Sequence, residues 1–343
     1  LLPSQTTQNL IRVFFLRERL KANGKGKSGV KHLHVVGAGT MGAEIGAWAA
    51  LQGMVVTISD PFPQALGKAV KSANKLFKRK LEGPELLAAT DRFIPDPKGD
   101  GVVSADLIIE AAPEKVDLKH KIYAGLEAKM KPDAVLATNT SSLDLNELAK
   151  GLKNPERFVG IHFFNPVSRL ELVEVVKQDK SSDAAYKTAL KFVGDISRQP
   201  LPVKASPGFL VNRALMPYLG EALLMIDEGE QKERIDAAAE DFGMPMGPVE
   251  LADQVGLDIC LAVAESLARD LDRPMPEIPQ WLHDKVAAGE LGRKTGKGLY
   301  DYDPDGKPKK GKVKKAPTSA MQDRLVLPMI DAVARCLDTR VVE

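Results

Sequence analysis

The sequence predicts an α/β fold: a doubly wound, mostly parallel sheet followed by an all-α domain. Short apolar runs alternate with helical patterns through the first 206 residues, which is typical of parallel strands joined by helices. From Gly208 onward the strand-like runs disappear and helical patterns dominate. The chain has 343 residues, and single cores usually stop growing at about 250–300, so we expect two domains.

The first strand, helix and strand are expected between residues 31 and 59. Lys31–Val36 has the apolar residues of a buried strand, Thr40–Gln52 is rich in helix formers, and Met54–Ser59 returns to β-branched residues. A unit of about 30 residues is what a parallel crossover requires. Beyond it we expect strands at Phe93–Ile94, Leu107–Ile109, Ala134–Ala137, Phe158–Phe163 and Leu172–Val176, and helices at Phe62–Glu82, Leu118–Met130 and Ser182–Ile196.

The rest of the chain is expected to be helical or irregular. A rough apolar stripe predicts a linker helix in residues 1–29, and the chain opens without methionine, as a piece of a longer protein would. Residues 303–317 predict a Lys-rich exposed linker. Residues 318–343 predict the truncated start of a second helical repeat, because Arg324-Leu-Val-Leu-Pro328 echoes Arg213-Ala-Leu-Met-Pro217, although chance also explains so short a match. The other expected helices are Phe209–Glu228, Lys232–Phe242, Val249–Leu271 and Ile278–Ala288.

Composition excludes several classes of protein. The formal charge is only +2 with both signs interspersed, which argues against a nucleic-acid binder. Cys260 and Cys336 lie far apart without a second ligand nearby, so neither a metal site nor a disulfide framework is expected, and a reducing compartment fits best. No apolar run approaches the roughly 20 residues that span a bilayer, and the first residues resemble neither a signal peptide nor an anchor.

The motif Gly37-Ala-Gly-Thr-Met-Gly42 follows the first expected strand and opens the next helix. In this context Gly37 permits a tight turn, Gly39 lets the backbone approach a pyrophosphate, and Gly42 lets the helix pack close to the strand. The alternative is an ordinary Gly-rich turn between a strand and a helix. We therefore predict a Rossmann-type dinucleotide-binding domain over residues 30–206, and a helical C-terminal domain over residues 207–302.

Asp60 closes the next strand, 18 positions after Gly42. A carboxylate at this place accepts hydrogen bonds from the ribose diol and repels a 2′-phosphate, which favours NAD over NADP. The same position also suits a helix N-cap ahead of Pro61.

Two polar residues interrupt neighbouring apolar strands. His162 lies within Phe158–Phe164, and Glu174 lies within Leu172–Val176. A lone strand histidine is usually a satisfied core residue, but a buried carboxylate is costly unless it is paired. Because a short turn separates the two strands, the side chains can be neighbours, and a paired histidine and carboxylate is a common acid–base arrangement.

Two further polar positions lie near expected strand or domain ends. The run Asn139-Thr-Ser-Ser142 follows a strand, where ligands bind in open α/β sheets, but it equally suits a turn and an N-cap for the helix from Leu145. Asn212 lies at the expected domain boundary, where substrates often bind, with capping or packing of its own helix as the alternative.

Eight short motifs follow one another along residues 31–302. They are Gly37-Ala-Gly-Thr-Met-Gly42, Glu110-Ala-Ala-Pro-Glu114, Asn139-Thr-Ser-Ser-Leu143, Gly160-Ile-His-Phe-Phe-Asn-Pro166, Leu172-Val-Glu-Val-Val176, Pro207-Gly-Phe-Leu-Val-Asn-Arg213, Pro245-Met-Gly-Pro248 and Lys294-Thr-Gly-Lys-Gly-Leu-Tyr300. In these motifs and their order the chain resembles the L-3-hydroxyacyl-CoA dehydrogenase family. The flanking segments resemble a multifunctional fatty acid β-oxidation enzyme of the alpha-subunit type, truncated at both ends.

The resemblance implies reversible, NAD-dependent oxidation of a 3-hydroxyacyl-CoA to a 3-ketoacyl-CoA in fatty acid β-oxidation. By motif, His162 matches the general base, Glu174 its partner, and Ser141 and Asn212 the residues that hold substrate and nicotinamide. The residues that match or are expected to form the cofactor site are Gly37, Gly39, Thr40, Met41, Gly42, Asp60, Glu114, Lys119 and Asn139.

Alternatives from other classes are another β-hydroxyacid dehydrogenase, which would use a lysine of the helical region, and a non-catalytic NAD-binding relative. The resemblance further implies an acyl-CoA substrate, a thiolase subunit and the missing hydratase domain as partners, and helical domains that pair within or between chains. A cytoplasmic, bacterial-type location is expected, with an organellar β-oxidation compartment as the alternative.

Overall fold

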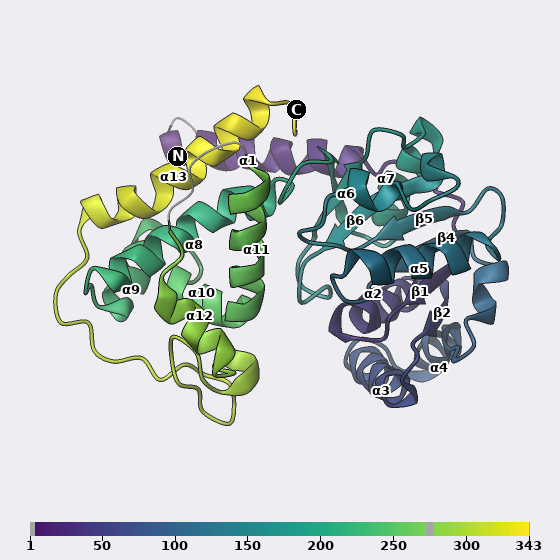
Figure 1. Cartoon of the computed structure of the whole chain (residues 1–343), viewed down its shortest axis with the longest axis horizontal. Coiled ribbons are helices and arrows are strands. Elements are labelled where there is room, and N and C mark those ends of the chain that lie inside the picture. The colour runs from purple at the N-terminus through teal and green to yellow at the C-terminus, as the bar shows by residue number, and fades with distance from the viewer. Residues whose placement is uncertain (1–3, 272–276, 343) are drawn as a thin grey trace. The chain divides into compact units, whose positions relative to one another are not determined.

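The computed structural model describes residues 4–271 and 277–342. The chain divides into two compact units between Ala205 and Ser206 (Figure 1). The first unit contains the sheet and the second is helical, so the predicted fold class is confirmed. In the described part of the chain, no helix combines the length and the apolar character needed to cross a bilayer.

One eight-stranded sheet forms the first unit, in the order β3-β2-β1-β4-β5-β6-β7-β8. Every neighbouring pair is parallel except β6 and β7, which run antiparallel. The strand order reverses between β1 and β4, which is where an open α/β sheet binds ligands. The strands are β1 (His32–Val36), β2 (Val55–Ser59), β3 (Phe93–Pro95), β4 (Leu107–Glu110), β5 (Val135–Thr138), β6 (Phe158–Phe163), β7 (Leu172–Lys177) and β8 (Gln199–Lys204).

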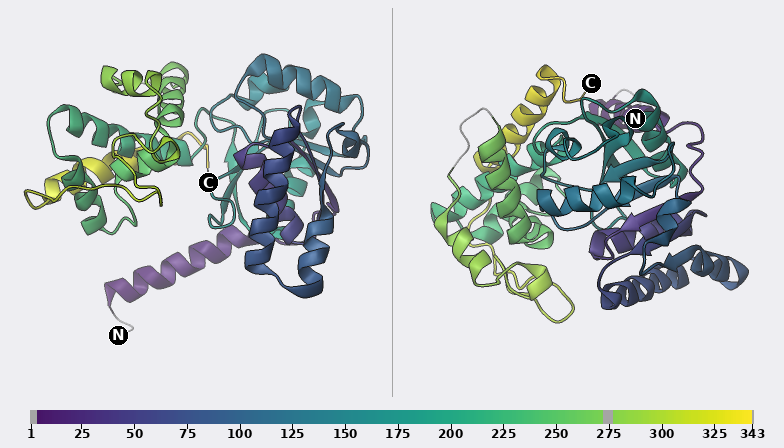
Figure 2. Two further views of the ribbon diagram at one scale, coloured as in Figure 1. Left: turned by 90° about the horizontal axis from the view of Figure 1, so that it is seen from below. Right: turned by 45° about the vertical axis from the view of Figure 1, so that its right-hand side comes forward.

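Helices cover both faces of this sheet. On one face α2 and α7 lie close together. The Trp48 indole of α2 donates to the carbonyl of Ile196, just after α7. On the other, α5 lies across the strands (Figures 1 and 2), and its Tyr123 ring contacts Phe158 of β6. The helices of this unit are α1 (Gln5–Ala22), α2 (Thr40–Leu51), α3 (Pro63–Lys80), α4 (Gly83–Arg92), α5 (Val116–Glu127), α6 (Leu145–Ala149) and α7 (Asp183–Asp195), with short 3-10 turns η1 (Asp100–Val103) and η2 (Pro155–Arg157).

Side-chain alternation sorts the residues of the strands between these two faces. Odd-numbered residues of β4 and β6, such as Ile109 and Ile161, enter the apolar core on the α2 and α7 side. Glu110 and His162 alternate with them and therefore point to the α5 side. The buried polar groups of the strands thus lie together on one face.

The second unit has its own apolar core. A single helix over Val249–Leu271 was expected, but Gly256, at φ +107°, divides it into two helices, so that prediction is wrong in detail. The elements are α8 (Val211–Asp227), α9 (Lys232–Phe242), α10 (Pro248–Val255), α11 (Leu257–Asp270), α12 (Gln280–Ala287), η3 (Arg293–Thr295) and α13 (Ser319–Asp338).

The two helices that share the short repeat pack against each other. Pro217 lies inside α8 and Pro328 inside α13, at matching positions of the repeat. Arg324 of α13 donates to Glu221 of α8 at 2.8 Å and to Glu228, just beyond it, at 2.6 and 2.7 Å. Both copies of the short repeat therefore lie in helices that contain an internal proline.

Two elements of the sheet unit were missed by the sequence interpretation. The strand β8 contains Pro200 and Pro202, which cannot donate to a ladder and so hide a strand. It lies at the edge of the sheet, where proline is tolerated. Helix α4 was missed because the chain between β2 and β3 forms two helices, with α3 ending at Lys80 rather than Glu82.

Candidate active site

The turn between β1 and α2 is built on three glycines. Gly37 has φ +101°, and a Cβ there would lie 2.7 Å from the carbonyl oxygen of Ala111. A Cβ on Gly42 would lie 1.9 Å from the carbonyl oxygen of Gly37, so a side chain would force α2 away from the turn. At Gly39 a Cβ would meet nothing within 4 Å, so the backbone there faces open space. The turn is crowded on the protein side and open where a ligand would lie.

This open turn fits the pyrophosphate of NAD. Gly39 is the N-cap of α2 and supplies no side-chain cap, while Thr40 and Met41 form the first turn, which contains no acidic residue. The first amides of a helix lack acceptors within the helix, and the helix dipole favours an anion at this end. The residues predicted to hold the pyrophosphate therefore lie at the N-terminus of α2.

Asp60 ties the glycine turn to the segment before α3. Its Oδ2 accepts from the Ala38 amide and its Oδ1 from the Phe62 amide, both at 2.8 Å. The alternative role as N-cap is wrong, because α3 begins at Pro63 and its N-cap is Phe62. A carboxylate fixed beside the glycine turn, at the end of the second strand, suits recognition of a ribose diol.

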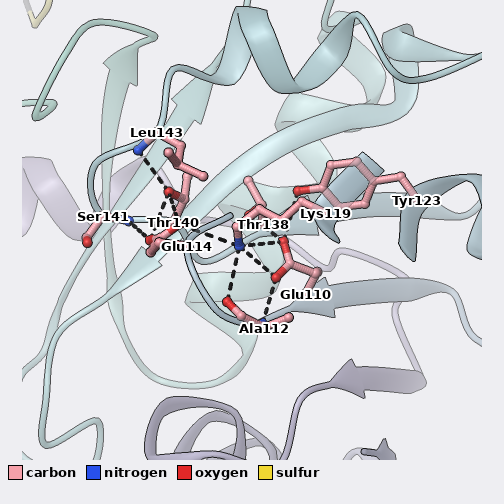
Figure 3. Close-up of polar contacts among 9 residues, drawn as sticks. All are labelled: Glu110, Ala112, Glu114, Lys119, Tyr123, Thr138, Thr140, Ser141 and Leu143. Carbon is pink, nitrogen blue, oxygen red and sulfur yellow. Dashed lines mark hydrogen bonds and ion pairs between the residues drawn. The ribbon is translucent and has the colours of Figure 1, made fainter. Parts of the chain in front are cut away.

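A buried ion pair lies at the carboxyl end of β4 (Figure 3). The fully buried Glu110 accepts from Lys119 Nζ at 2.7 and 2.9 Å and from the Ala112 amide at 2.6 Å. Its Oε2 also accepts from the hydroxyls of Tyr123 at 2.9 Å and Thr138 at 2.8 Å. Burial and the charge of Glu110 raise the pKa of the Tyr123 hydroxyl, which keeps it a donor. Lys119, predicted as a cofactor residue, is itself only 1% exposed.

Glu114 joins the loop after β4 to the loop after β5. Its carboxylate oxygens lie 2.9 and 2.8 Å from the Thr140 hydroxyl, and Oε1 accepts from the Ser141 amide at 2.8 Å. One residue earlier, Asn139 Oδ1 accepts from the Phe163 amide at 2.9 Å, which links this loop to the end of β6. Glu114, Ser141 and Asn139 therefore lie in the loops at the carboxyl edge of the sheet.

His162 and Glu174 lie directly opposite each other on β6 and β7. Nδ1 of His162 lies 2.8 Å from Oε2 of Glu174, with side-chain exposures of 7% and 0%. The Phe164 ring packs edge-on against the imidazole, with 4.6 Å between centroids. A carboxylate acceptor at Nδ1 favours the tautomer that carries its proton there, so the ring can take up a proton at Nε2 and form an imidazolium beside a negative charge. The contact predicted from the two interrupted strands is present.

Two capping alternatives can also be compared with the structure. The N-cap of α6 is Asp144, which accepts from the Asn146 amide, so the Asn139–Ser142 run does not cap that helix. Asn212 is the second residue of α8, whose N-cap is Leu210, and it belongs to the second unit.

A basic hollow of about 250 Å³ lies between α2, α3 and the segment after β6. Its charged lining is mainly cationic, from Lys75 and Arg79 on α3 and from Arg169, with Glu44 as the acidic member. Glu44 accepts from the Val167 amide at 2.7 Å and so holds the segment after β6. Such a lining suits an anionic part of a ligand.

Sequence reasoning missed Glu110 and the basic hollow as parts of a site. Glu110 belongs to the motif Glu110-Ala-Ala-Pro-Glu114, but no role was predicted for it. The spacing of four residues from Lys119 to Tyr123 was the available signal that both side chains lie on the side of the helix that faces the sheet. Residues 4–271 and 277–342 contain no group of three or more His, Cys, Asp or Glu side chains arranged to hold a metal ion.

Comparison with known protein families matches both units. The profile described as 3-hydroxyacyl-CoA dehydrogenase, NAD binding domain, matches residues 32–206, and the profile described as 3-hydroxyacyl-CoA dehydrogenase, C-terminal domain, matches residues 208–302. Together they cover most of the chain.

Similar proteins carry related names. The chain is 34% identical over 369 aligned positions to the fatty acid oxidation complex subunit alpha of Pseudomonas putida, covering 99% of this chain and 51% of that protein. It resembles the crystal structure of (S)-3-hydroxybutyryl-CoA dehydrogenase from Ralstonia eutropha, with TM-score 0.76, 35% identity, and coverage of 80% of this chain and 100% of that one. The 3-hydroxybutyryl-CoA dehydrogenase of Escherichia coli K12 gives TM-score 0.76 and 34% identity, covering 85% and 63%. The chain spans about half the length of the curated relatives it matches.

Proposed function

The chain belongs to the 3-hydroxyacyl-CoA dehydrogenase family, and from this premise we propose that it reversibly oxidises a 3-hydroxyacyl-CoA to a 3-ketoacyl-CoA with NAD. The observation that carries the proposal is the buried contact of 2.8 Å between His162 and Glu174 at the carboxyl edge of the sheet. NAD supplies the acceptor for the hydride of the substrate carbon. The chain's own residues supply the proton chemistry and the orientation.

In the oxidation, His162 acts as the general base and removes the proton of the 3-hydroxyl at Nε2. Glu174, opposite Nδ1, stabilises the imidazolium that results. In the reverse direction the same imidazolium returns the proton to the carbonyl oxygen. Because both side chains are buried, water screens their interaction little.

Five polar residues are proposed to orient the substrate and the cofactor. Ser141 and Asn212 hold the hydroxyl and the thioester carbonyl, and a fixed orientation lowers the entropic part of the barrier. Asn139 and Glu114 define the cofactor side of the same edge, supported by their bonds to Phe163 and Ser141. Lys119 helps to position the cofactor side indirectly, because it donates to Glu110 and to the carbonyl oxygen of Ala112 in the loop after β4.

The basic hollow supports an acyl-CoA as the substrate. Coenzyme A carries phosphate groups far from its thioester, and Lys75, Arg79 and Arg169 line a hollow on the unit that also holds His162. Cations recognise phosphate through charge-assisted hydrogen bonds. We assign the phosphate end of the substrate to this hollow.

The wider setting of the reaction follows from the relatives. Some of them are named as alpha subunits of a fatty acid oxidation complex, and we propose that this chain takes part in such a complex in β-oxidation. The resemblance of the flanking segments implies a hydratase domain and a thiolase subunit as its partners there. A bacterial cytoplasm is the proposed location.

The test measures NADH absorbance during reduction of acetoacetyl-CoA by the wild type and by His162→Gln. Loss of a general base typically lowers turnover by about 10²–10⁴-fold, so kcat should fall by that factor. NADH affinity, measured by fluorescence titration, should stay within about twofold of the wild-type value, because the proposed role of His162 is proton transfer and not cofactor binding. An unchanged kcat would remove His162 from the mechanism, and a wild type that binds NADH without turnover would indicate a non-catalytic relative.

A further inference from the structure

The ammonium of Lys119 has three protons, and three acceptors surround it. They are Glu110 Oε1 at 2.7 Å, Glu110 Oε2 at 2.9 Å and the carbonyl oxygen of Ala112 at 3.3 Å (Figure 3). An ammonium carries three donors and no acceptor, so these contacts use all of them. Lys119 is 1% exposed, and water cannot replace a lost partner easily.

A second carboxylate lies just beyond this set. Glu114 Oε2 is 3.6 Å from Lys119 Nζ, an ion pair outside hydrogen-bond distance. The same carboxylate accepts from the Thr140 hydroxyl and the Ser141 amide. Glu114 can therefore bind either of two donors: the buried ammonium of Lys119 or the loop after β5. Glu110 favours the contact with the loop, because it accepts from two of the three N–H donors of Lys119.

The cluster lies under the place where the sheet binds a dinucleotide. Ala111, next to the Ala112 amide held by Glu110, approaches Gly37 so closely that a Cβ there would lie 2.7 Å from its carbonyl oxygen. The loops after β1 and β4 thus meet at the reversal of strand order, where Rossmann-type sheets bind the cofactor. A shift of the loop after β4 would be transmitted to the glycine turn.

We infer that Glu110 is a positioning residue: by saturating Lys119 it leaves Glu114 to fix the loop that carries Ser141, and it holds the loop after β4 against the glycine turn. The inference rests on the proposed function for its kinetic consequence, but its structural consequence stands without it. A buried ion pair is weak evidence for a purely stabilising role, since well-packed apolar residues of similar volume often stabilise as much. The Glu110–Lys119 pair lies at the carboxyl edge of the sheet, where it can position the loops that surround the cofactor.

The test compares Glu110→Gln with the double variant that combines Glu110→Gln and Lys119→Met. In Glu110→Gln the ammonium loses its charged partner and should capture Glu114, which releases Ser141. We expect NADH to bind about tenfold more weakly, and amide hydrogen exchange in residues 139–145 to become at least tenfold faster. In the double variant no ammonium remains to capture Glu114, so exchange should return toward the wild-type rate and NADH should bind at least threefold more tightly than in Glu110→Gln.

Thr138→Val serves as the matched control. It removes one hydrogen bond to Glu110 but leaves both Lys119 contacts, so NADH affinity and loop exchange should stay within about twofold even if the melting temperature falls. If Glu110→Gln lowers only the melting temperature, Glu110 is structural and the inference is overturned. If the double variant binds NADH no better than Glu110→Gln, Lys119 acts on the cofactor directly, which also overturns it.

Two further outcomes keep this inference separate from the proposed function. If Glu110→Gln does not fold, the double variant decides alone: wild-type exchange in residues 139–145 supports the inference, and fast exchange contradicts it. If the wild type shows no turnover with acetoacetyl-CoA but the exchange pattern is as expected, the proposed function fails and the positioning role stands.

Discussion

Two buried carboxylates, one in each unit, are held in different ways. Glu174 of β7 faces the titratable imidazole of His162. Asp253 of α10 accepts from the amides of Leu299 and Tyr300 at 2.7 and 2.8 Å and from the Tyr302 hydroxyl at 3.1 Å. Both are essentially inaccessible to solvent, at 0% and 1% exposure.

The difference between them separates chemistry from architecture. Backbone amides and a tyrosine hydroxyl do not ionise near neutral pH, and burial raises the pKa of the Tyr302 hydroxyl further. Asp253 therefore joins the segment around Tyr300 to α10. An imidazole can accept a proton at one ring nitrogen while it donates from the other, so the partner of Glu174 can take part in proton transfer. Burial of a carboxylate alone does not indicate an active site; the identity of its partner does.

The largest expected effect comes from Glu174→Gln. An amide can donate to His162 Nδ1 and so favour the wrong tautomer, and it cannot stabilise an imidazolium. We expect kcat for acetoacetyl-CoA reduction to fall by about 10²–10⁴-fold, with a change of a few degrees at most in melting temperature. Full activity in a folded variant would place Glu174 with the structural carboxylates and break the comparison.

Asp253→Asn should have the opposite signature. The amide nitrogen of asparagine would face backbone N–H donors, and a buried donor left unsatisfied costs about 1–3 kcal/mol. The unfolding free energy should therefore fall by about this amount in urea denaturation. Below the melting temperature, NADH affinity and kcat should match the wild type, and a kcat loss as large as that of Glu174→Gln would show that the two clusters are not distinct in kind.

His34 sharpens the comparison as a buried histidine without a close carboxylate partner. Its ring nitrogens lie 2.8 Å from the Thr57 hydroxyl and 3.0 Å from the Ser59 hydroxyl, and Asp96 is 3.9 Å away. Burial lowers its pKa from 6.5 to about 4. We expect it to affect stability and not catalysis.

The pH dependence follows from that lowered pKa. As pH falls below 6.5 the unfolded chain binds a proton at His34 before the folded chain does, so stability is lost between pH 6.5 and about 4. The loss amounts to about 3 kcal/mol at one pKa unit per 1.36 kcal/mol. Urea denaturation at pH 7 and pH 4.5 should show a smaller difference for His34→Gln than for the wild type. Equal differences would mean that His34 titrates normally in the folded state.

The smallest effect tests substrate binding apart from proton transfer. Lys75→Ala and Arg169→Ala remove cations from the basic hollow, and each lost contact to phosphate should raise KM for acetoacetyl-CoA by about 3–10-fold while kcat stays the same. A truncated thioester without the nucleotide part serves as control, and its KM should not change. Equal effects on both thioesters would remove the phosphate assignment of this hollow.

The sequence alone determined features that neighbouring residues encode. Periodicity identified most strands and helices, the glycine pattern identified the turn before α2, and the unusual polar residues within two apolar strands pointed to His162 and Glu174. The same local reading failed where the local signal was misleading: prolines concealed β8, and Gly256 looked like a tolerated residue inside one long helix.

Tertiary structure alone decided the partners of Glu110. Glu110 of β4 meets Thr138, 28 residues along the chain, because β4 and β5 are neighbours with these two residues in register. It meets Lys119 and Tyr123 because α5 turns that side toward the sheet. The spacing of Lys119 and Tyr123 places them on one side of α5, but which strand residue that side meets depends on the packing of the whole unit.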